Sequence, residues 1–475
     1  MNIFKKLRSF YKSKSNDNIY SFYGAVPIKK AIPFGLQHVL AMFIANITPI
    51  LIVYGLSSID ASIKANAIRS AILFAGIGTL IQLFPIWKVG SKLPIVVGVS
   101  FTFVGVLSQV LLQYGYGSMI TSIIIGGVFI GILGLFSKYW TKFITPIVSS
   151  SVVLAIGLSL LGVGATSFFG GSNLFSGTYD FSSNWPLILI ASFSLLASTL
   201  WFFLCKGIWK NISILVGLVL GLALSLILNI WFNIIDFSVL NVSSVTDIIN
   251  VPRLVDFSSL KFDATAIIVV CIIYLVASTE GIGDMNGIAY GGFNREPTQK
   301  EISGGITCDG FISAIGGLFG SLPLTTFSQN VSIVSQTKVV NRFSISLGAI
   351  FLILCSFFPI LANFILLIPE AVLGGVMITL FAQIVVIAMQ MISKAGFTTK
   401  NIFIISLSVG LGYGITLLGD NFFSTIPTYI SLIISNPVIN MFVISLVLSL
   451  LIKEKKIDST SAPKTEEDST INTSL

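Results

Sequence analysis

Three acidic residues lie within or at the edge of long apolar stretches of this sequence. Glu280 and Asp284 stand four residues apart, and Asp309 opens a later apolar stretch. Residues with this spacing share one face of a helix, and two carboxylates held close together favour sharing a proton, as a proton carrier requires. The alternative for Glu280 and Asp284 is an exposed helix end, and for Asp309 a helix start. In an apolar segment each acid is a candidate functional residue.

Amides, hydroxyls and aromatic rings supply a second set of candidates. Gln329 and Asn330 follow a Thr-Thr-Phe-Ser run, and a primary amide can pair with the alternating N–H and C=O edge of a lactam or ureide. His38 is the only histidine of the chain, and packing is the alternative role for it. Flanking residues that could stack on or hydrogen-bond to a flat ring are Ser100, Phe101, Phe327 and Ser328.

Motifs for cofactor chemistry are missing from the sequence. It has no phosphate-binding loop and no pair of residues spaced as metal ligands. We expect its four cysteines to be packing residues. We therefore expect no cofactor or metal, and we expect a proton as the coupling ion, with sodium as the alternative. The cysteines are Cys205, Cys271, Cys308 and Cys355.

The composition predicts an all-α polytopic membrane protein. Of the 475 residues 54% are hydrophobic and 10% are charged, whereas a soluble domain carries about 25% charged residues. Apolar runs long enough to cross a bilayer recur through the chain. The predicted spans are 34–56, 67–87, 93–109, 118–137, 145–166, 185–205, 212–235, 264–283, 304–320, 324–337, 343–366, 371–392, 401–418 and 436–452.

The distribution of basic residues predicts the topology. With fourteen spans and a cytoplasmic N-terminus, all but four of the 27 Lys and Arg residues fall on the inner side, as the positive-inside rule requires. The four outside are Lys64, Arg69, Arg253 and Lys261. We expect the protein to lie in the cell (inner) membrane with both termini in the cytoplasm and a disordered tail. The net charge of +8 is explained by this topology, so we expect no nucleic-acid binding.

The spacing of short motifs predicts an internal duplication. Leu93-Pro94 and Leu322-Pro323 each precede a short, interrupted span, and the first spans of the two halves start at a similar offset. Seven spans is an odd number, so the second copy enters the membrane inverted. Spans 3 and 10 are then broken helices that meet at the membrane midplane, where a small polar ligand could bind.

These residues resemble the nucleobase/ascorbate transporter family, which includes bacterial xanthine and uracil permeases. The most specific element is Gln-Asn-Val-Ser-Ile-Val-Ser-Gln-Thr-Lys over residues 329–338, with Ser332 where the family signature has Gly. Supporting matches are Gln37-His38, Gly98-Val99-Ser100-Phe101, Glu280 with Gly283-Asp284, and Asp309-Gly310.

The resemblance implies a homodimer in which a core domain moves against a gate domain. It assigns Glu280 and Gln329 to substrate binding, with Ser100, Phe101, Phe327, Ser328 and Asn330 around them, and His38, Asp284 and Asp309 to proton coupling. The implied division is an N-terminal segment 1–33, core 34–137 and 264–366, gate 138–236 and 367–453, an extracytoplasmic loop 237–263, and a cytoplasmic tail 454–475.

The resemblance also implies a substrate. Gln at position 329 is similar to purine carriers of the xanthine and uric acid type, whereas Glu there is typical of uracil permeases. We therefore expect proton-coupled purine symport by alternating access and no enzymatic activity. The alternatives are a uracil permease, an anion transporter of the sulfate type with the same architecture, and a membrane-embedded enzyme.

Overall fold

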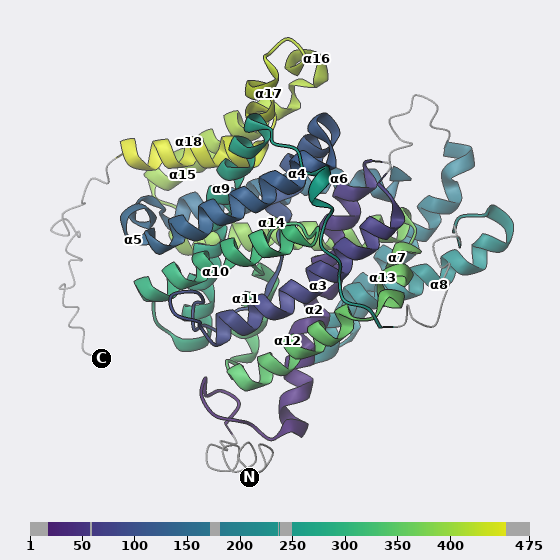
Figure 1. The fold of residues 1–475 in the computed structure, drawn as a ribbon, viewed down its shortest axis with the longest axis horizontal. Helices are drawn as coiled ribbons and strands as arrows, with labels where there is room; N and C mark the ends of the chain where they lie inside the picture. Colours follow the sequence, from purple (N-terminus) through teal and green to yellow (C-terminus); the bar gives the residue numbers. More distant parts are fainter. Residues whose placement is uncertain (1–17, 58, 172–180, 236, 238–248, 453–475) are drawn as a thin grey trace, which may run out of the picture.

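The structure, a computed structural model, describes residues 18–57, 59–171, 181–235, 237 and 249–452. It is a bundle of helices with one small sheet (Figure 1). The first half contains α2 (Ile28–Gly55), α3 (Ala61–Leu83), β1 (Val97–Val99), α4 (Val104–Leu135), α5 (Ser137–Trp140), α6 (Pro146–Phe168), α7 (Phe181–Leu204) and α8 (Ser213–Phe232). The second contains α9 (Ala264–Phe293), α10 (Gln299–Leu318), β2 (Leu324–Thr326), α11 (Ser328–Thr337), α12 (Arg342–Ser356), α13 (Pro359–Leu366), α14 (Glu370–Ala395), α15 (Thr399–Leu407), α16 (Asp420–Phe423), α17 (Thr428–Ile434) and α18 (Pro437–Leu451).

The predicted class, an all-α polytopic membrane protein, is confirmed. Within the described residues nine helices are long and apolar enough to cross a membrane, or up to eleven if each of two bent pairs is one span. One of the nine, 101–135, covers two predicted spans because α4 breaks at Gly115, where φ is 82°. With α10 and the β2–α11 segment, every predicted span has a counterpart in the described part of the chain.

Several spans differ in detail from the prediction. The first helix begins at Ile28, within the segment predicted to precede the membrane. The span predicted over 343–366 is two helices, α12 and α13, bent by 81° at Phe357–Phe358. Hydropathy alone could not show this break, since residues 343–366 are mostly apolar and a proline such as Pro359 is also tolerated as a first helical residue. The tail predicted over 454–475 lies outside the described residues.

Spans 3 and 10 are broken, as predicted, and they cross as antiparallel strands. Gly98 of β1 pairs with Thr325 of β2, and the strands are extended by bonds from Ser100 N to Pro323 O (3.0 Å) and Phe327 N to Val96 O (2.9 Å). Backbone polar groups at membrane depth need partners. Neighbouring helices supply some of them, because Asn46 Oδ1 accepts from Val99 N at 2.7 Å and Thr79 Oγ1 accepts from Val97 N at 3.0 Å.

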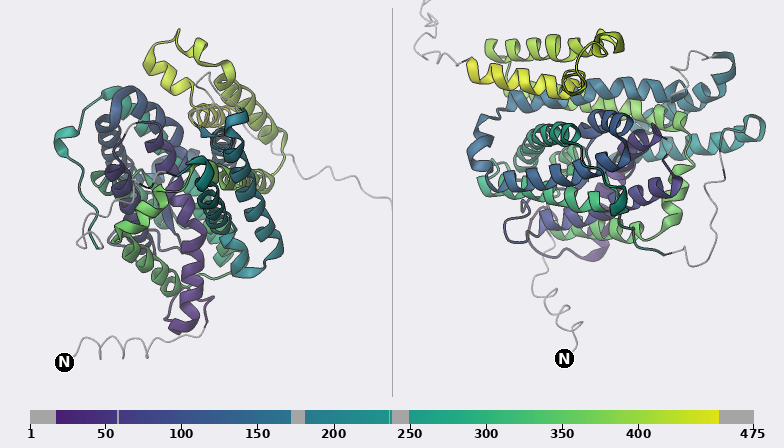
Figure 2. Two further views of the ribbon diagram at one scale, coloured as in Figure 1. Left: turned by 90° about the vertical axis from the view of Figure 1, so that its right-hand side faces the viewer. Right: turned by 45° about the horizontal axis from the view of Figure 1, so that its top comes forward.

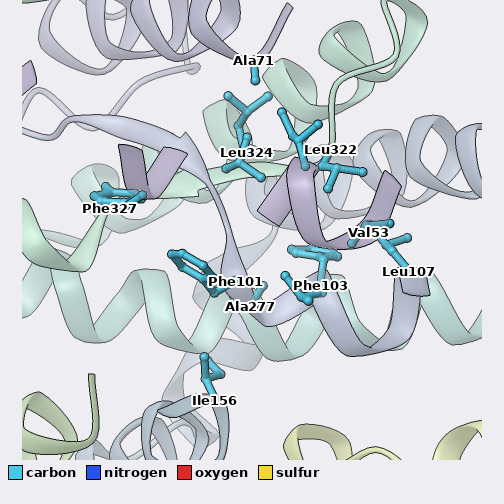
Figure 3. Packing of buried hydrophobic residues seen from close by; sticks show 14 of the residues in the cluster. Val53, Ala71, Phe101, Phe103, Leu107, Ile156, Ala277, Leu322, Leu324 and Phe327 are labelled. Carbon is cyan, nitrogen blue, oxygen red and sulfur yellow. The ribbon is translucent and has the colours of Figure 1, made fainter. Parts of the chain in front are cut away.

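The helices around the crossing pack closely. α4 packs on α9 and α10, while α3 and α2 pack on α12. α14 packs on α6, α7 and α8, and α18 packs on α6. Figure 2 shows α15 to α18, in yellow-green, stacked together along one side of the molecule. Figure 3 shows the buried apolar side chains gathered around the strand crossing.

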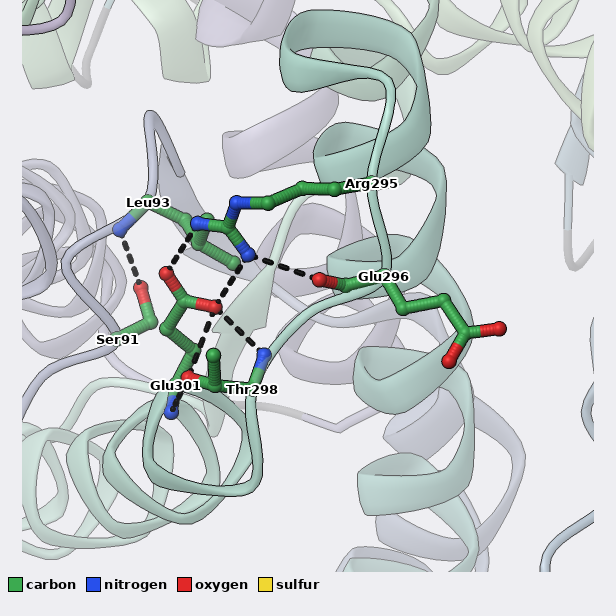
Figure 4. A network of polar contacts seen from close by, with 6 residues as sticks. All are labelled: Ser91, Leu93, Arg295, Glu296, Thr298 and Glu301. Atoms are coloured by element: carbon green, nitrogen blue, oxygen red, sulfur yellow. Dashed lines mark hydrogen bonds and ion pairs between the residues drawn. The ribbon is translucent and has the colours of Figure 1, made fainter.

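A polar turn fixes the connection between α9 and α10 (Figure 4). The Arg295 guanidinium donates to both carboxylate oxygens of Glu301, at 2.8 and 2.6 Å. Glu301 also closes a capping box with Thr298 at the start of α10. Such reciprocal bonds satisfy the free N–H groups of a helix start and so set the direction in which α10 leaves the turn.

Candidate functional site

A small pocket opens where the two strands end. Its polar wall comes from the residues after β1, from α9, and from β2 with the start of α11. Ile156 of α6 and Ile384 of α14 add apolar surface to the lining. Six residues predicted to bind substrate line this pocket, namely Ser100, Phe101, Glu280, Phe327, Ser328 and Gln329.

Glu280 is held by two hydroxyl groups. Thr102 Oγ1 donates to Glu280 Oε2 at 2.5 Å, and Ser328 Oγ lies 3.2 Å from Glu280 Oε1. Thr102 is buried and lies in the short helical turn Phe101–Phe103 between β1 and α4, so the broken span 3 supplies the first of these donors. The carboxylate is thus oriented toward the pocket by side chains from spans 3 and 10.

Ser328 connects Glu280 to the second acid. Its Oγ lies 2.8 Å from Asp284 Oδ2 as well as within reach of Glu280. A hydroxyl group has one hydrogen to donate, so it can satisfy only one carboxylate at a time. If one acid is protonated, that acid donates to Ser328 Oγ, and Ser328 in turn donates to the other. The three groups therefore fit together best when they hold one shared proton.

Gln329 presents an amide that no other described residue engages. Its side chain is half-buried and lines the pocket, while its backbone carbonyl accepts from Ser332 Oγ at 2.7 Å. A primary amide carries two donor hydrogens and an acceptor oxygen. Gln329 can therefore pair with a ligand, and Ser332, the departure from the family signature, bonds only within its own helix among the described residues.

Asp309 lies behind the pocket and holds β2 in place. Its Oδ2 accepts from Thr326 N at 3.1 Å and from Thr326 Oγ1 at 3.2 Å, and its Oδ1 accepts from Gln82 Nε2 at 2.9 Å. Asp309 is buried and does not line the Glu280 pocket. The structure thus brings it to the strand crossing and not into the Glu280 pocket.

His38 and Asn330 meet each other away from the pocket. His38 Nδ1 and Asn330 Nδ2 are 3.0 Å apart, and both residues are fully enclosed. Asn330 was predicted among the substrate-binding residues, but its amide points to α2 and does not line the pocket. The pair ties the first turn of α11 to α2.

Sequence reasoning did not single out four polar residues that support the site. Thr102 binds Glu280, Gln82 binds Asp309, and Asn46 and Thr79 bind the β1 backbone. Asn46, Thr79 and Gln82 stand inside apolar helices, and this is the sequence signal that could have found them. The partners of Asn46 and Gln82, however, are 53 and 227 residues away in the chain.

Two aromatic rings, Phe101 and Phe327, line the pocket. Phe101 meets Phe381 of α14 edge to face, with centroids 5.4 Å apart and planes at 83°. Figure 3 shows Phe101 and Phe327 on the two chain segments that continue from the strands.

Within the described residues no group of three His, Cys, Asp or Glu side chains could hold a metal ion.

Membrane-length helices, two crossed broken spans and a pocket lined by an acid and an amide define a multi-pass membrane transport protein. A family model described as a permease family matches residues 29–420. The chain belongs to this family, the nucleobase/ascorbate transporters, as its sequence motifs indicated. It is a permease and not an enzyme.

Proteins of known function share most of its length. It is 30% identical to the xanthine permease of Bacillus subtilis over 90% of this chain and 96% of that protein. It is 30% identical to xanthine permease XanQ of Escherichia coli, over 89% and 91%, and 31% identical to the B. subtilis uric acid permease PucK, over 80% and 86%.

Solved structures share the fold at low sequence identity. The transmembrane domain of the cyanobacterial bicarbonate transporter BicA has a TM-score of 0.55 and 16% identity, covering 90% of this chain and all of that domain. The transporter SLC26A9 has a TM-score of 0.62 and 12% identity, covering 90% of this chain and 66% of its own.

Proposed function

We propose that this protein is a proton-coupled symporter that carries xanthine, uric acid or both into the cell by alternating access. The observation that carries the proposal is that Glu280 and the unengaged amide of Gln329 line one pocket, with Ser328 linking Glu280 to Asp284. The names of the relatives, xanthine and uric acid permeases, support the same substrate class.

The chemistry of the pocket fits an oxidised purine. An ionised Glu280 only accepts hydrogen bonds, so it pairs with ring N–H groups, whereas Gln329 pairs with an N–H and a carbonyl together. Phe101 and Phe327 border the pocket and offer ring surfaces for stacking. Xanthine and uric acid present both edges, and a hydrogen bond to a charged group is worth about 1.5–3 kcal/mol.

Proton coupling follows from the acids around Ser328. A neutral purine that donates to Glu280 requires this carboxylate to be ionised, which moves the shared proton onto Asp284. Substrate and proton then occupy adjacent positions and move together. Asp309 and His38 act on this network indirectly, since Asp309 fixes Thr326 and His38 fixes Asn330.

The position of the pocket fits motion between two domains. Its polar wall belongs to the proposed core domain, residues 34–137 and 264–366, and its apolar wall of Ile156 and Ile384 belongs to the proposed gate domain, residues 138–236 and 367–453. Sliding of one against the other exposes the pocket to each side in turn. We place the protein in the cell membrane as a homodimer with both termini in the cytoplasm.

Uptake by cells that lack their own purine carriers tests the substrate. We expect uptake of radiolabelled xanthine, inhibited by uric acid and not by uracil, and lowered about 10- to 100-fold by Glu280→Gln, as the loss of a charged hydrogen-bond acceptor predicts. Glu296→Gln is the matched control, because Glu296 lies exposed on the α9–α10 turn. If uracil alone inhibits uptake, the purine assignment is wrong and a uracil assignment replaces it. If the chain carries no nucleobase, the proposal is refuted.

Proteoliposomes test the coupling separately. An imposed inward pH gradient should drive xanthine accumulation, and a proton uncoupler should abolish it, whether or not sodium is present. Accumulation that follows a sodium gradient and ignores the pH gradient would assign the coupling to sodium.

A further inference from the structure

A second cavity lies where α3 begins and shares no lining residue with the Glu280 pocket. Arg69 of α3 and Arg253 of the segment before α9 both line it, with Asn66, Tyr116 and Asn363 beside them. Leu254 and Ile360 add apolar surface. The transport mechanism uses none of these residues.

The arginines of this cavity are exceptions to the charge distribution of the chain. Only Lys64, Arg69, Arg253 and Lys261 fall outside in the proposed topology, and two of these four line the cavity. Basic residues are less frequent on that side of a membrane protein, so two arginines in one cavity there are unusual.

Arg69 is buried and fixed by carbonyl groups. Its Nε donates to Ser356 O at 3.0 Å and its Nη2 donates to Asn250 O. Ser356 is the last residue of α12, where backbone carbonyls carry partial negative charge. These contacts hold the guanidinium in position without neutralising it, because among the described residues the one ion pair is Arg295–Glu301.

Arg253 has a fixed backbone and a free side chain. Its N donates to Asn66 Oδ1 at 2.7 Å, and its carbonyl accepts from Asn66 Nδ2 at 2.9 Å. The guanidinium itself is exposed and has no recorded partner among the described residues. The acid of the cavity, Asp256, accepts from Ser258 N and Oγ at 2.9 and 2.7 Å and forms no ion pair with either arginine.

Two exposed apolar side chains line the cavity together with the arginines. Leu254 and Ile360 are each 53% exposed. α13 is bent by 81° from α12, so with α12 across the membrane α13 runs roughly parallel to the membrane plane. A free anion would gain nothing from this apolar rim, whereas a phospholipid has both a phosphate for the guanidinium groups and acyl chains for the rim.

We propose that this cavity binds the phosphate headgroup of an anionic phospholipid. Arg69 supplies a fixed positive charge, Arg253 folds over the phosphate, and the acyl chains lie against Leu254 and Ile360. The bound lipid ties the segment 249–256 to α3 and α13. It thereby stabilises the end of the bundle at which α12 breaks.

The test uses the purified full-length protein in mild detergent. The melting temperature and lipid adducts in native mass spectrometry are measured with phosphatidylglycerol, with phosphatidylcholine and with inorganic phosphate. The variants are Arg253→Gln, the charge-conserving Arg253→Lys, and Lys261→Gln as a control for an exposed outer basic residue that does not line the cavity.

We expect phosphatidylglycerol alone to raise the melting temperature and to form a defined adduct. Arg253→Gln should raise the phosphatidylglycerol concentration needed for half of the full effect about fivefold, which corresponds to the contribution of one basic residue near an anionic surface. Arg253→Lys and Lys261→Gln should leave this concentration unchanged. Equal effects of both lipids, an equal effect of inorganic phosphate, or equal behaviour of Arg253→Gln and Lys261→Gln would each overturn the proposal.

Discussion

At the scale of single residues, the site depends on hydroxyl groups that orient carboxylates. Thr102 and Ser328 come from the two broken spans, and both contact Glu280, which comes from neither. A charged hydrogen bond of this kind contributes more than a neutral one. The two hydroxyls therefore set how Glu280 faces its ligand, and each can be removed with little change in volume.

Thr102→Val should weaken substrate binding. The substitution keeps the shape of the side chain but removes the donor 2.5 Å from Glu280 Oε2, so we expect the half-saturating xanthine concentration to rise about tenfold or more. Uptake kinetics measure this effect. Thr121→Val is the control, because the Thr121 hydroxyl donates only to Gly117 O of its own helix, at 2.8 Å; equal effects of the two variants would rule out a specific role for Thr102.

Ser328→Ala should impair coupling more than binding. Without the hydroxyl, Glu280 and Asp284 lose the donor that both contact, so a proton passes less readily between them. We expect accumulation driven by a pH gradient in proteoliposomes to fall about tenfold, with a smaller change in xanthine exchange at equal pH. Ser332→Ala should leave both unchanged, because the Ser332 hydroxyl donates to Gln329 O of its own helix. An equal loss of exchange and accumulation would contradict this role.

At the scale of elements, small residues let two helices beside the strand crossing, α4 and α10, approach closely. α4 and α10 pack through Gly127, Gly131 and Gly310, and a Cβ at Gly310 would lie 2.8 Å from Gly127 O. Backbone atoms cannot move aside as a flexible side chain does. The closeness of α4 and α10 in turn positions Asp309 under β2.

Gly310→Ala should therefore lower the free energy of unfolding by about 1–3 kcal/mol, as overpacking of a tight contact does. The melting temperature of the purified protein measures this loss. Gly162→Ala on α6 is the matched control, since a Cβ there would meet no atom within 4 Å. Equal melting temperatures for the two variants would show that α4 and α10 can move apart without a loss in the free energy of unfolding.

At the scale of the whole molecule, the proposed transport cycle requires the two proposed domains to move past each other. Gln109 of α4 and Ser435 after α17 bridge them with a hydrogen bond of 3.1 Å, whereas Thr145 and Ser449 bridge two parts of the proposed gate domain at the same distance. The two pairs offer a direct comparison of a moving and a static contact.

Cysteine pairs at these positions should behave oppositely in a background without the native cysteines. Oxidative cross-linking of Gln109→Cys with Ser435→Cys should abolish uptake, and reduction should restore it. Cross-linking of Thr145→Cys with Ser449→Cys should leave uptake intact. Uptake that survives a complete cross-link of the first pair would exclude relative motion at this contact.

The sequence by itself determined the class of the molecule and singled out three acids that the structure places at or beside the strand crossing. Apolar length, basic residues on alternating sides and the paired Leu-Pro motifs predicted a polytopic bundle with broken spans 3 and 10, and the structure has both breaks. These features are local, because a bilayer imposes its thickness and its lack of water on each segment separately. Glu280, Asp284 and Asp309 could also be identified from the sequence, because an acid in an apolar segment is likewise a local feature.

Only the tertiary structure decided which groups meet. It paired Gly98 with Thr325, placed Thr102 on Glu280 and Gln82 on Asp309, and directed Asn330 to His38. It also bent the span after Arg342 into two helices. Each of these contacts joins residues far apart in the chain, and their geometry follows from how closely whole helices pack, which no local pattern of residues encodes.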